Sequence, residues 1–174
     1  MQKSYSKELL VAVDAVNQAG EVLLDRFNRL HEFKLKEDNT EQLPEDIMSE
    51  KILVNSISEN FPKDIILTEE SNPDIKESSR VWIFDPLCGS YSYLRGVETW
   101  SISMALVSEG AYKVGVVYIP LLDLLFSAEA GKGLFLNGNK IENNQFNHRK
   151  DAFISVEHAV FNSGKINILK LIKD

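Results

Sequence analysis

Hydrophobic positions recur at helical spacing in two stretches of the first third of the chain. The first stretch, residues 4–30, carries one wide apolar stripe: Leu9, Leu10, Val13, Val16, Ala19, Val22, Leu23 and Phe27. A second helix is predicted from Pro44, because a proline in the first turn of a helix loses no hydrogen bond. The dipeptide Phe61-Pro62 ends this helix, and its apolar face comprises Ile47, Ile52, Leu53, Ile57 and Phe61.

Short runs of strand-forming residues occupy most of the remaining sequence. Ile65–Leu67 and Val81–Phe84 are predicted strands, and Phe33–Lys36 is a further short one. Three β-rich runs separated by turn sequences predict an antiparallel meander: Ser101–Val107, Val114–Ile119 and Leu124–Ala128. A last hairpin over residues 131–140 is closed by an Asn-Gly turn. Together these elements predict an α/β fold in which a helix pair packs on a largely antiparallel sheet.

The end of the chain carries too few elements to form a core of its own. Glu142–Asp151 is a polar connection, Ala152–Val156 a predicted strand and Ile166–Ile172 a predicted helix. Either this segment packs on the preceding sheet or it begins a second domain. We place the boundary between an N-terminal domain, residues 1–145, and a C-terminal segment, residues 146–174.

Composition narrows the classes of protein that the chain can represent. Its 174 residues are 44% hydrophobic and 26% charged, which is typical of a soluble globular domain. A net charge of -7 disfavours a nucleic-acid surface and suits carboxylates gathered around a hard cation. One cysteine excludes an internal disulfide framework, and the polar start of the chain has no apolar span. A cytoplasmic protein without membrane contact is expected.

Two of the predicted strands are followed by carboxylates. Glu69 follows the first strand and Asp85 the second, so the two side chains meet if the strands are neighbours. The Leu87 carbonyl adds a further oxygen, and oxygen ligands are what Mg²⁺ prefers. These residues therefore predict a metal site.

Phosphate contacts are predicted directly after the second of these strands. Gly89 and Ser90 offer backbone N–H groups to a phosphate if a helix begins there. Asp46, in the first turn of the second predicted helix, can orient a water through the Ser90 hydroxyl. Each residue also has an ordinary interpretation: Asp46 as a helix cap, Glu69 in a solvated turn and Asp85 before Pro86 as the start of a turn.

Taken together, four ordered motifs resemble the inositol monophosphatase family. That family has an acidic Glu-Glu pair, an Asp-Pro-Ile-Asp-Gly-Thr motif, a Val-Ser-Ile-Ala-Leu strand and a Gly-x-Gly-x-x-x-Asn-Gly hairpin. The matching segments here are Leu67-Thr68-Glu69-Glu70-Ser71, Asp85-Pro86-Leu87-Cys88-Gly89-Ser90, Ile102-Ser103-Met104-Ala105-Leu106 and Gly131-Lys132-Gly133-Leu134-Phe135-Leu136-Asn137-Gly138.

The resemblance implies a layered α/β fold and magnesium-dependent hydrolysis of a small phosphorylated metabolite, an inositol or sugar phosphate. Members of the family are commonly dimers. The implied roles are these: metal ligation by Glu69, Asp85 and the Leu87 carbonyl, water activation by Asp46 and Ser90, phosphate contact by Gly89 and Ser90, and support of the metal ligands by Glu70.

Three departures from the family pattern put this activity in question. Cys88 stands where the family has an aspartate that ligates a second metal, and a thiol is a poor magnesium ligand. Leu43 replaces the family's threonine ahead of Asp46. The family's C-terminal half, with its Trp-Asp motif and substrate-recognition residues, has no counterpart after Asp151.

Two hypotheses follow from these observations. The chain is a phosphatase with impaired or lost activity, or one completed by a second chain that supplies the missing half. Alternatively it is a non-catalytic pseudophosphatase that serves for binding or self-association, as a homodimer for example.

Overall fold

A computed structural model describes residues 5–29, 34–35, 41–68 and 80–141 of the chain. The chain divides into two compact units, Met1–Glu142 and Asn143–Asp174. The predicted connection, strand and helix after residue 141 lie outside the described residues, as do Glu69 and Glu70. The domain boundary after residue 145 stays a prediction.

Both long helices form where hydrophobic periodicity predicts them. Helix α1 spans Lys7–Arg26. Ser6 caps its start, and the Ser6 hydroxyl oxygen accepts a hydrogen bond from the Leu9 N–H at 3.2 Å. Helix α2 spans Pro44–Asn60 and has its proline in the first turn. It ends at Phe61, as the Phe61-Pro62 dipeptide predicts.

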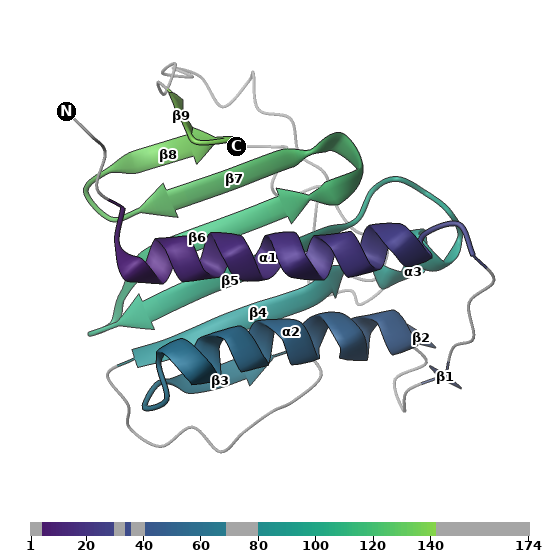
Figure 1. Ribbon diagram of the computed structural model, residues 1–174, viewed down its shortest axis with the longest axis horizontal. Helices are drawn as coiled ribbons and strands as arrows, with labels where there is room; N and C mark the ends of the chain where they lie inside the picture. Colours follow the sequence, from purple (N-terminus) through teal and green to yellow (C-terminus); the bar gives the residue numbers. More distant parts are fainter. Residues whose placement is uncertain (1–4, 30–33, 36–40, 69–79, 142–174) are drawn as a thin grey trace, which may run out of the picture. The chain divides into compact units, whose positions relative to one another are not determined.

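A seven-stranded sheet forms the second layer, with strand order β3-β4-β5-β6-β7-β8-β9 (Figure 1). Strands β3 and β4 run parallel, and every other neighbouring pair in this sheet is antiparallel. The α/β fold class is confirmed. The strand bounds are Ile65–Thr68 (β3), Arg80–Cys88 (β4), Ser101–Ser108 (β5), Ala111–Ile119 (β6), Leu124–Glu129 (β7), Gly133–Leu136 (β8) and Asn139–Ile141 (β9).

Shorter elements complete the described part of the chain. Strands β1 (Lys34–Leu35) and β2 (Glu41–Gln42) form a separate antiparallel pair. A one-turn helix, α3, spans Ser90–Leu94, and a 3₁₀ turn spans Pro120–Leu122. Asn137 and Gly138 join β8 to β9 with positive φ angles of 46° and 75°, the geometry of the predicted Asn-Gly turn.

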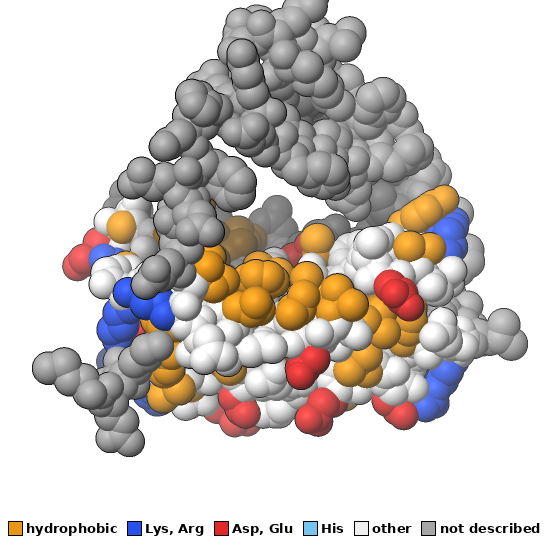
Figure 2. All heavy atoms as spheres, turned by 90° about the horizontal axis from the view of Figure 1, so that it is seen from above, with side chains coloured by type: hydrophobic (Ala, Val, Ile, Leu, Met, Phe, Trp, Pro, Cys, Tyr) orange, Lys and Arg blue, Asp and Glu red, His pale blue; other side chains and the backbone are white. Residues whose placement is uncertain are grey.

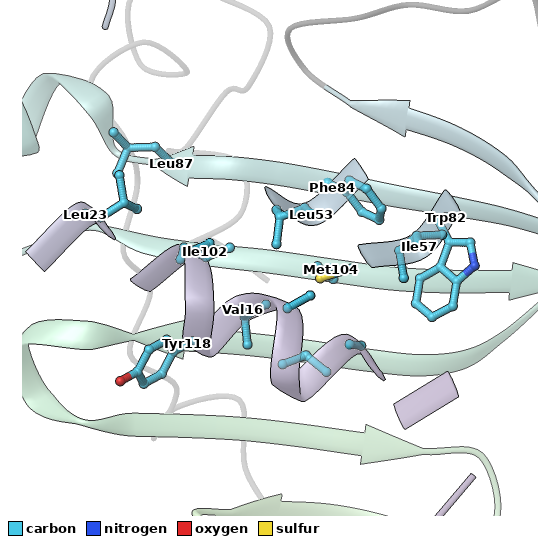
Figure 3. Close-up of a cluster of buried hydrophobic side chains, with 14 of the residues drawn as sticks. Val16, Leu23, Leu53, Ile57, Trp82, Phe84, Leu87, Ile102, Met104 and Tyr118 are labelled. Carbon is cyan, nitrogen blue, oxygen red and sulfur yellow. The ribbon is translucent and has the colours of Figure 1, made fainter. Parts of the chain in front are cut away.

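The core lies between the helices and one face of the sheet (Figure 3). Alternate residues of the central strands point to this face, and Trp82, Ile102 and Val116 are almost completely buried there. Helix α1 crosses the middle strands closely: a Cβ on Gly20 would lie 2.5 Å from the ring of Tyr118. None of the helices among the described residues combines the length and apolar character that crossing a membrane requires.

Candidate functional site at the ends of β3 and β4

Strands β3 and β4 are the neighbours that the predicted metal site needs. They pair in parallel from Ile65 beside Val81 to Thr68 beside Phe84. The carboxyl ends of both strands therefore reach the same edge of the sheet. Glu69, which follows Thr68, and Glu70 lie outside the described residues, so their roles stay predictions.

Strand β4 continues beyond its predicted end and carries Asp85, Leu87 and Cys88 within it. The turn interpretation of Asp85-Pro86 is wrong. Asp85 still pairs with Ser103 of β5, and the register then shifts before Cys88 pairs with Ser101. Pro86 has no N–H to give to the sheet, which accounts for the irregularity at this point. Leu87 is buried, whereas the Cys88 residue is exposed.

Gly89 turns the chain from β4 into α3. Its φ of 89° lies in the left-handed region, and a Cβ at this position would approach the Thr99 carbonyl oxygen to 2.8 Å. Glycine is therefore required on two counts. A helix does begin at Ser90, as the predicted phosphate contact requires. Its Tyr93 hydroxyl donates to the Leu23 carbonyl at 2.7 Å, which anchors α3 to the end of α1.

Asp46 is buried in the first turn of α2 and caps that helix. Its Oδ2 accepts a hydrogen bond from the Leu43 N–H at 2.8 Å, while the Asp46 N–H donates to the Leu43 carbonyl at 3.1 Å. The capping interpretation is therefore confirmed for this oxygen. The action of Asp46 on a water through Ser90 stays a prediction.

Two further side chains of α2 hold the ends of the strands, and the sequence reasoning missed both. The Ser49 hydroxyl, fully buried, donates to the Pro86 carbonyl at 2.7 Å. Glu50 Oε1 accepts from the Thr68 hydroxyl at 2.6 Å. The available signal was their spacing from Asp46, three and four residues along a helix, which places all three on one face. This face of α2 fixes the positions of both strand ends.

An ion pair between a half-exposed arginine and a buried glutamate joins α1 to α2 near the same place, and it too was missed. Glu45, only 2% exposed, binds Arg26 with an Oε1–Nε distance of 2.7 Å. The hydrogen bond to Glu45 raises the pKa of Arg26. Burial, followed by the charge of Glu45, raises the pKa of Tyr93 in α3, so this phenol stays protonated. The pair keeps the two helix ends in register beside α3.

The donor set suits a hard cation in part. The Asp85 carboxylate and the Leu87 carbonyl are oxygen donors of the kind that Mg²⁺ takes. The Cys88 thiol is not. Within the described residues, no group of three or more His, Cys, Asp or Glu side chains could hold a metal ion.

A carboxylate, a backbone carbonyl and a helix start at one sheet edge form an arrangement at which α/β proteins commonly bind cations or phosphates. A model of the inositol monophosphatase family matches residues 5–169 of this chain. The chain therefore belongs to the inositol monophosphatase family.

Individual relatives are similar to this chain in sequence, and solved structures are similar to it in fold. A histidinol-phosphatase from Chlorobaculum parvum is 35% identical over 137 residues, which are 78% of this chain and 52% of that protein. Thermotoga maritima IMPase gives a TM-score of 0.74 at 28% identity, covering 81% of this chain and 55% of that one. An IMPase/NADP phosphatase complexed with Mg²⁺ and phosphate gives 0.67 at 26% identity, covering 75% and 50%. This chain thus spans about half the length of the relatives that it matches.

Proposed function

We propose that this chain forms the helix-and-sheet half of a magnesium-dependent phosphomonoesterase. One observation carries the proposal: the Ser49–Pro86 hydrogen bond holds the start of α2, with Asp46, against the end of β4, with Asp85 and Leu87. A relative of known structure is complexed with Mg²⁺ and phosphate, which supports the same pair of ligands here. The proposed substrate is a small phosphorylated metabolite, an inositol or sugar phosphate.

Each side chain or backbone group of the candidate site has a defined part in the proposed reaction. Asp85, the Leu87 carbonyl and Glu69 would hold Mg²⁺, which when bound neutralises phosphate charge. Gly89 and Ser90 donate backbone N–H groups to the phosphate oxygens. Asp46 accepts a proton from the attacking water through the Ser90 hydroxyl. Glu70 is proposed to support these ligands.

Cys88 lowers the proposed activity. Replacing an oxygen ligand by a thiol removes a charged oxygen from a site that works through electrostatics. Loss of one such group costs ~3 kcal/mol of transition-state stabilisation, about a hundredfold in rate. We therefore propose a slow enzyme, in the cytoplasm, whose activity is completed by the other half of the family fold.

A non-catalytic role is the second candidate, and the exposed Cys88 favours it. In that case the chain is a pseudophosphatase that binds a phosphorylated ligand or pairs with another chain. Phosphate binding without hydrolysis would distinguish this role from the first.

Phosphate release from inositol monophosphate and a panel of sugar phosphates, with Mg²⁺, tests the proposal. We expect slow hydrolysis by the parent chain mixed with the remaining half of a family member, and a loss of about a hundredfold or more in Asp85→Asn. Asp14→Asn, an exposed position on α1, is the matched control and keeps the parent rate. Equal rates in all three mixtures would contradict the assigned metal ligand.

Cys88→Asp tests the damage at the second metal position. This variant should bind Mg²⁺ more tightly and hydrolyse faster than the parent, by up to about a hundredfold. Cys88→Asn is the control, because it adds an oxygen of similar reach without a charge. If titration with Mg²⁺ shows equal affinity for the Asp and Asn variants, the proposal that Cys88 alone weakens the second metal position is wrong.

A further inference from the structure

The end of β3 is held by a side chain of α2. Glu50 Oε1 accepts a hydrogen bond from the Thr68 hydroxyl, and the two oxygens are 2.6 Å apart. Thr68 is the last residue of β3, is 5% exposed and directly precedes Glu69, a proposed metal ligand. A hydroxyl that donates to a carboxylate over so short a distance forms one of the stronger kinds of hydrogen bond. This bond therefore ties the residue next to a proposed ligand to a helix.

Strand β3 is short and stands at the edge of the described sheet. It has four residues, and β4 is its neighbour in the strand order. Their pairing ends with Thr68 beside Phe84, one residue before Asp85. A strand at the edge of a sheet lacks the second ladder of hydrogen bonds that fixes a central strand. The contact with Glu50 therefore carries much of the positioning of the chain where it leaves β3.

The same helix holds the end of β4 one residue beyond Asp85. Ser49, which is adjacent to Glu50, donates to the Pro86 carbonyl at 2.7 Å. Two consecutive residues of α2 thus bind the residue before one proposed ligand and the residue after another. Consecutive residues of an α-helix have a fixed rise of about 1.5 Å along its axis. Helix α2 therefore acts as a rigid spacer between the two strand ends.

From these contacts we infer that Glu50 is a positioning residue for the proposed Mg²⁺ site. Acting through Thr68, it sets how far Glu69 lies from Asp85. Mg²⁺ demands near-ideal octahedral geometry, so a small displacement of one ligand weakens its binding. Removal of a side chain that orients metal ligands typically lowers metal affinity by about 10- to 100-fold. The inference rests on the proposed function, because it concerns the same ligands.

Three substitutions separate the hydrogen bond from the charge of Glu50. Glu50→Ala removes the acceptor of the bond. Glu50→Gln removes the charge but keeps an oxygen that can accept from the Thr68 hydroxyl. Thr68→Val removes the donor and keeps a β-branched side chain at the end of β3. If the bond positions the ligand, Glu50→Ala and Thr68→Val act alike and Glu50→Gln resembles the parent.

A control for surface charge is required as well. The chain has a net charge of -7, and acidic side chains stand at separate points over the face that Figure 2 shows. Exposed carboxylates attract Mg²⁺ without any defined geometry, and salt screens this attraction. Glu59→Ala is the matched control, because it removes the same charge from an exposed position of α2.

Calorimetric titration with Mg²⁺ alone tests the inference without a measurement of hydrolysis, after circular dichroism has shown that each variant is folded. We expect Glu50→Ala and Thr68→Val each to bind Mg²⁺ about tenfold more weakly than the parent. The double variant should bind no more weakly than either, because both substitutions remove one interaction. Glu50→Gln and Glu59→Ala should stay within about twofold of the parent.

Two results overturn the positioning role by themselves. One is equal Mg²⁺ affinity of Glu50→Ala and the parent. The other is a Glu50→Gln variant that binds as weakly as Glu50→Ala, because the charge of Glu50 then acts directly.

Asp85→Asn, titrated in parallel, distinguishes this failure from a failure of the proposed function. If Asp85→Asn binds Mg²⁺ as tightly as the parent, the assigned ligand is wrong and the positioning role falls with it. If Asp85→Asn binds Mg²⁺ much more weakly while Glu50→Ala is unchanged, the proposed function stands and the positioning role alone is wrong.

Discussion

At the scale of single residues, the site depends on side chains that serve structure and chemistry together. Asp46 caps α2 with one carboxylate oxygen and is the proposed acceptor of a proton. Ser49, one turn further along, binds the carbonyl of Pro86 in the middle of the segment that holds Asp85 and Leu87. The acidic residues that the family motifs identify are therefore held in place by Ser49, a residue that lies outside those motifs.

Replacing Ser49 by alanine tests this positioning. Ser49→Ala leaves the buried Pro86 carbonyl without its hydroxyl donor, so we expect a loss of about 1–3 kcal/mol in the free energy of unfolding. Ser58→Ala, exposed on the same helix, should change stability by less than about 0.5 kcal/mol. Denaturant unfolding followed by tryptophan fluorescence measures both. Equal midpoints for the two variants would show that the hydrogen bond does not hold α2 against β4.

At the scale of elements, Glu129 is the last residue of β7, and its side chain links that strand to the start of α1. Its carboxylate accepts from the Ser6 N–H at 3.2 Å and binds the Lys132 ammonium at 2.6 Å. Burial by itself would raise the pKa of Glu129, but the hydrogen bonds from Lys132 and Ser6 outweigh it and hold the pKa below its usual value. The bond between helix and strand is therefore strongest when this group is ionised.

This lowered pKa predicts a pH dependence. The stabilisation is complete above the ordinary glutamate pKa and is lost as the pH falls through the lower pKa of the folded state. We expect Glu129→Gln to cost about 1 kcal/mol at neutral pH and almost nothing in acid. Thermal unfolding of Glu129→Gln and of Glu98→Gln, an exposed control, across this pH range measures the difference. If the difference in melting temperature between Glu129→Gln and the parent is the same at every pH, the proposed linkage to ionisation of Glu129 is wrong.

At the scale of the whole molecule, the core that the structure describes lies within the segment from α1 to β8. Every buried hydrophobic residue in it lies between Leu9 and Phe135. Both tryptophans of the chain, Trp82 and Trp100, are buried in this core and report directly on its packing.

A chain that ends at Glu142 should therefore keep the fold. We expect it to unfold in one cooperative transition with the tryptophan emission of the full chain. A chain that ends at Gly131 loses β8 and β9, including the buried Phe135, and should be destabilised by about 3–5 kcal/mol. Fluorescence and thermal unfolding of the two chains decide the matter. Exposed tryptophans in the chain ending at Glu142 would show that the core needs the remaining residues.

Local sequence determined most of the described elements of this protein and approximately where they lie. Helical periodicity predicted α1 and α2, β-forming runs predicted the meander, and Asn137-Gly138 predicted the last turn, because each depends on neighbouring residues. The ordered motifs also identified the family and the candidate residues from Asp46 to Ser90. Strand β4 extended past its prediction, since pairing with β5 outweighs the local preference of Asp85-Pro86 for a turn.

Tertiary structure alone decided which residues meet. The contacts of Ser49 with Pro86, Glu50 with Thr68 and Arg26 with Glu45 join segments 18 to 37 positions apart, and no local pattern specifies such pairs. The row of small residues on the sheet face opposite the helices likewise exists only because sheet register aligns Ala105, Gly115 and Ala128 across three strands. Hydrophobic periodicity says which side of a strand is apolar, whereas only the pairing of strands makes those sides one surface.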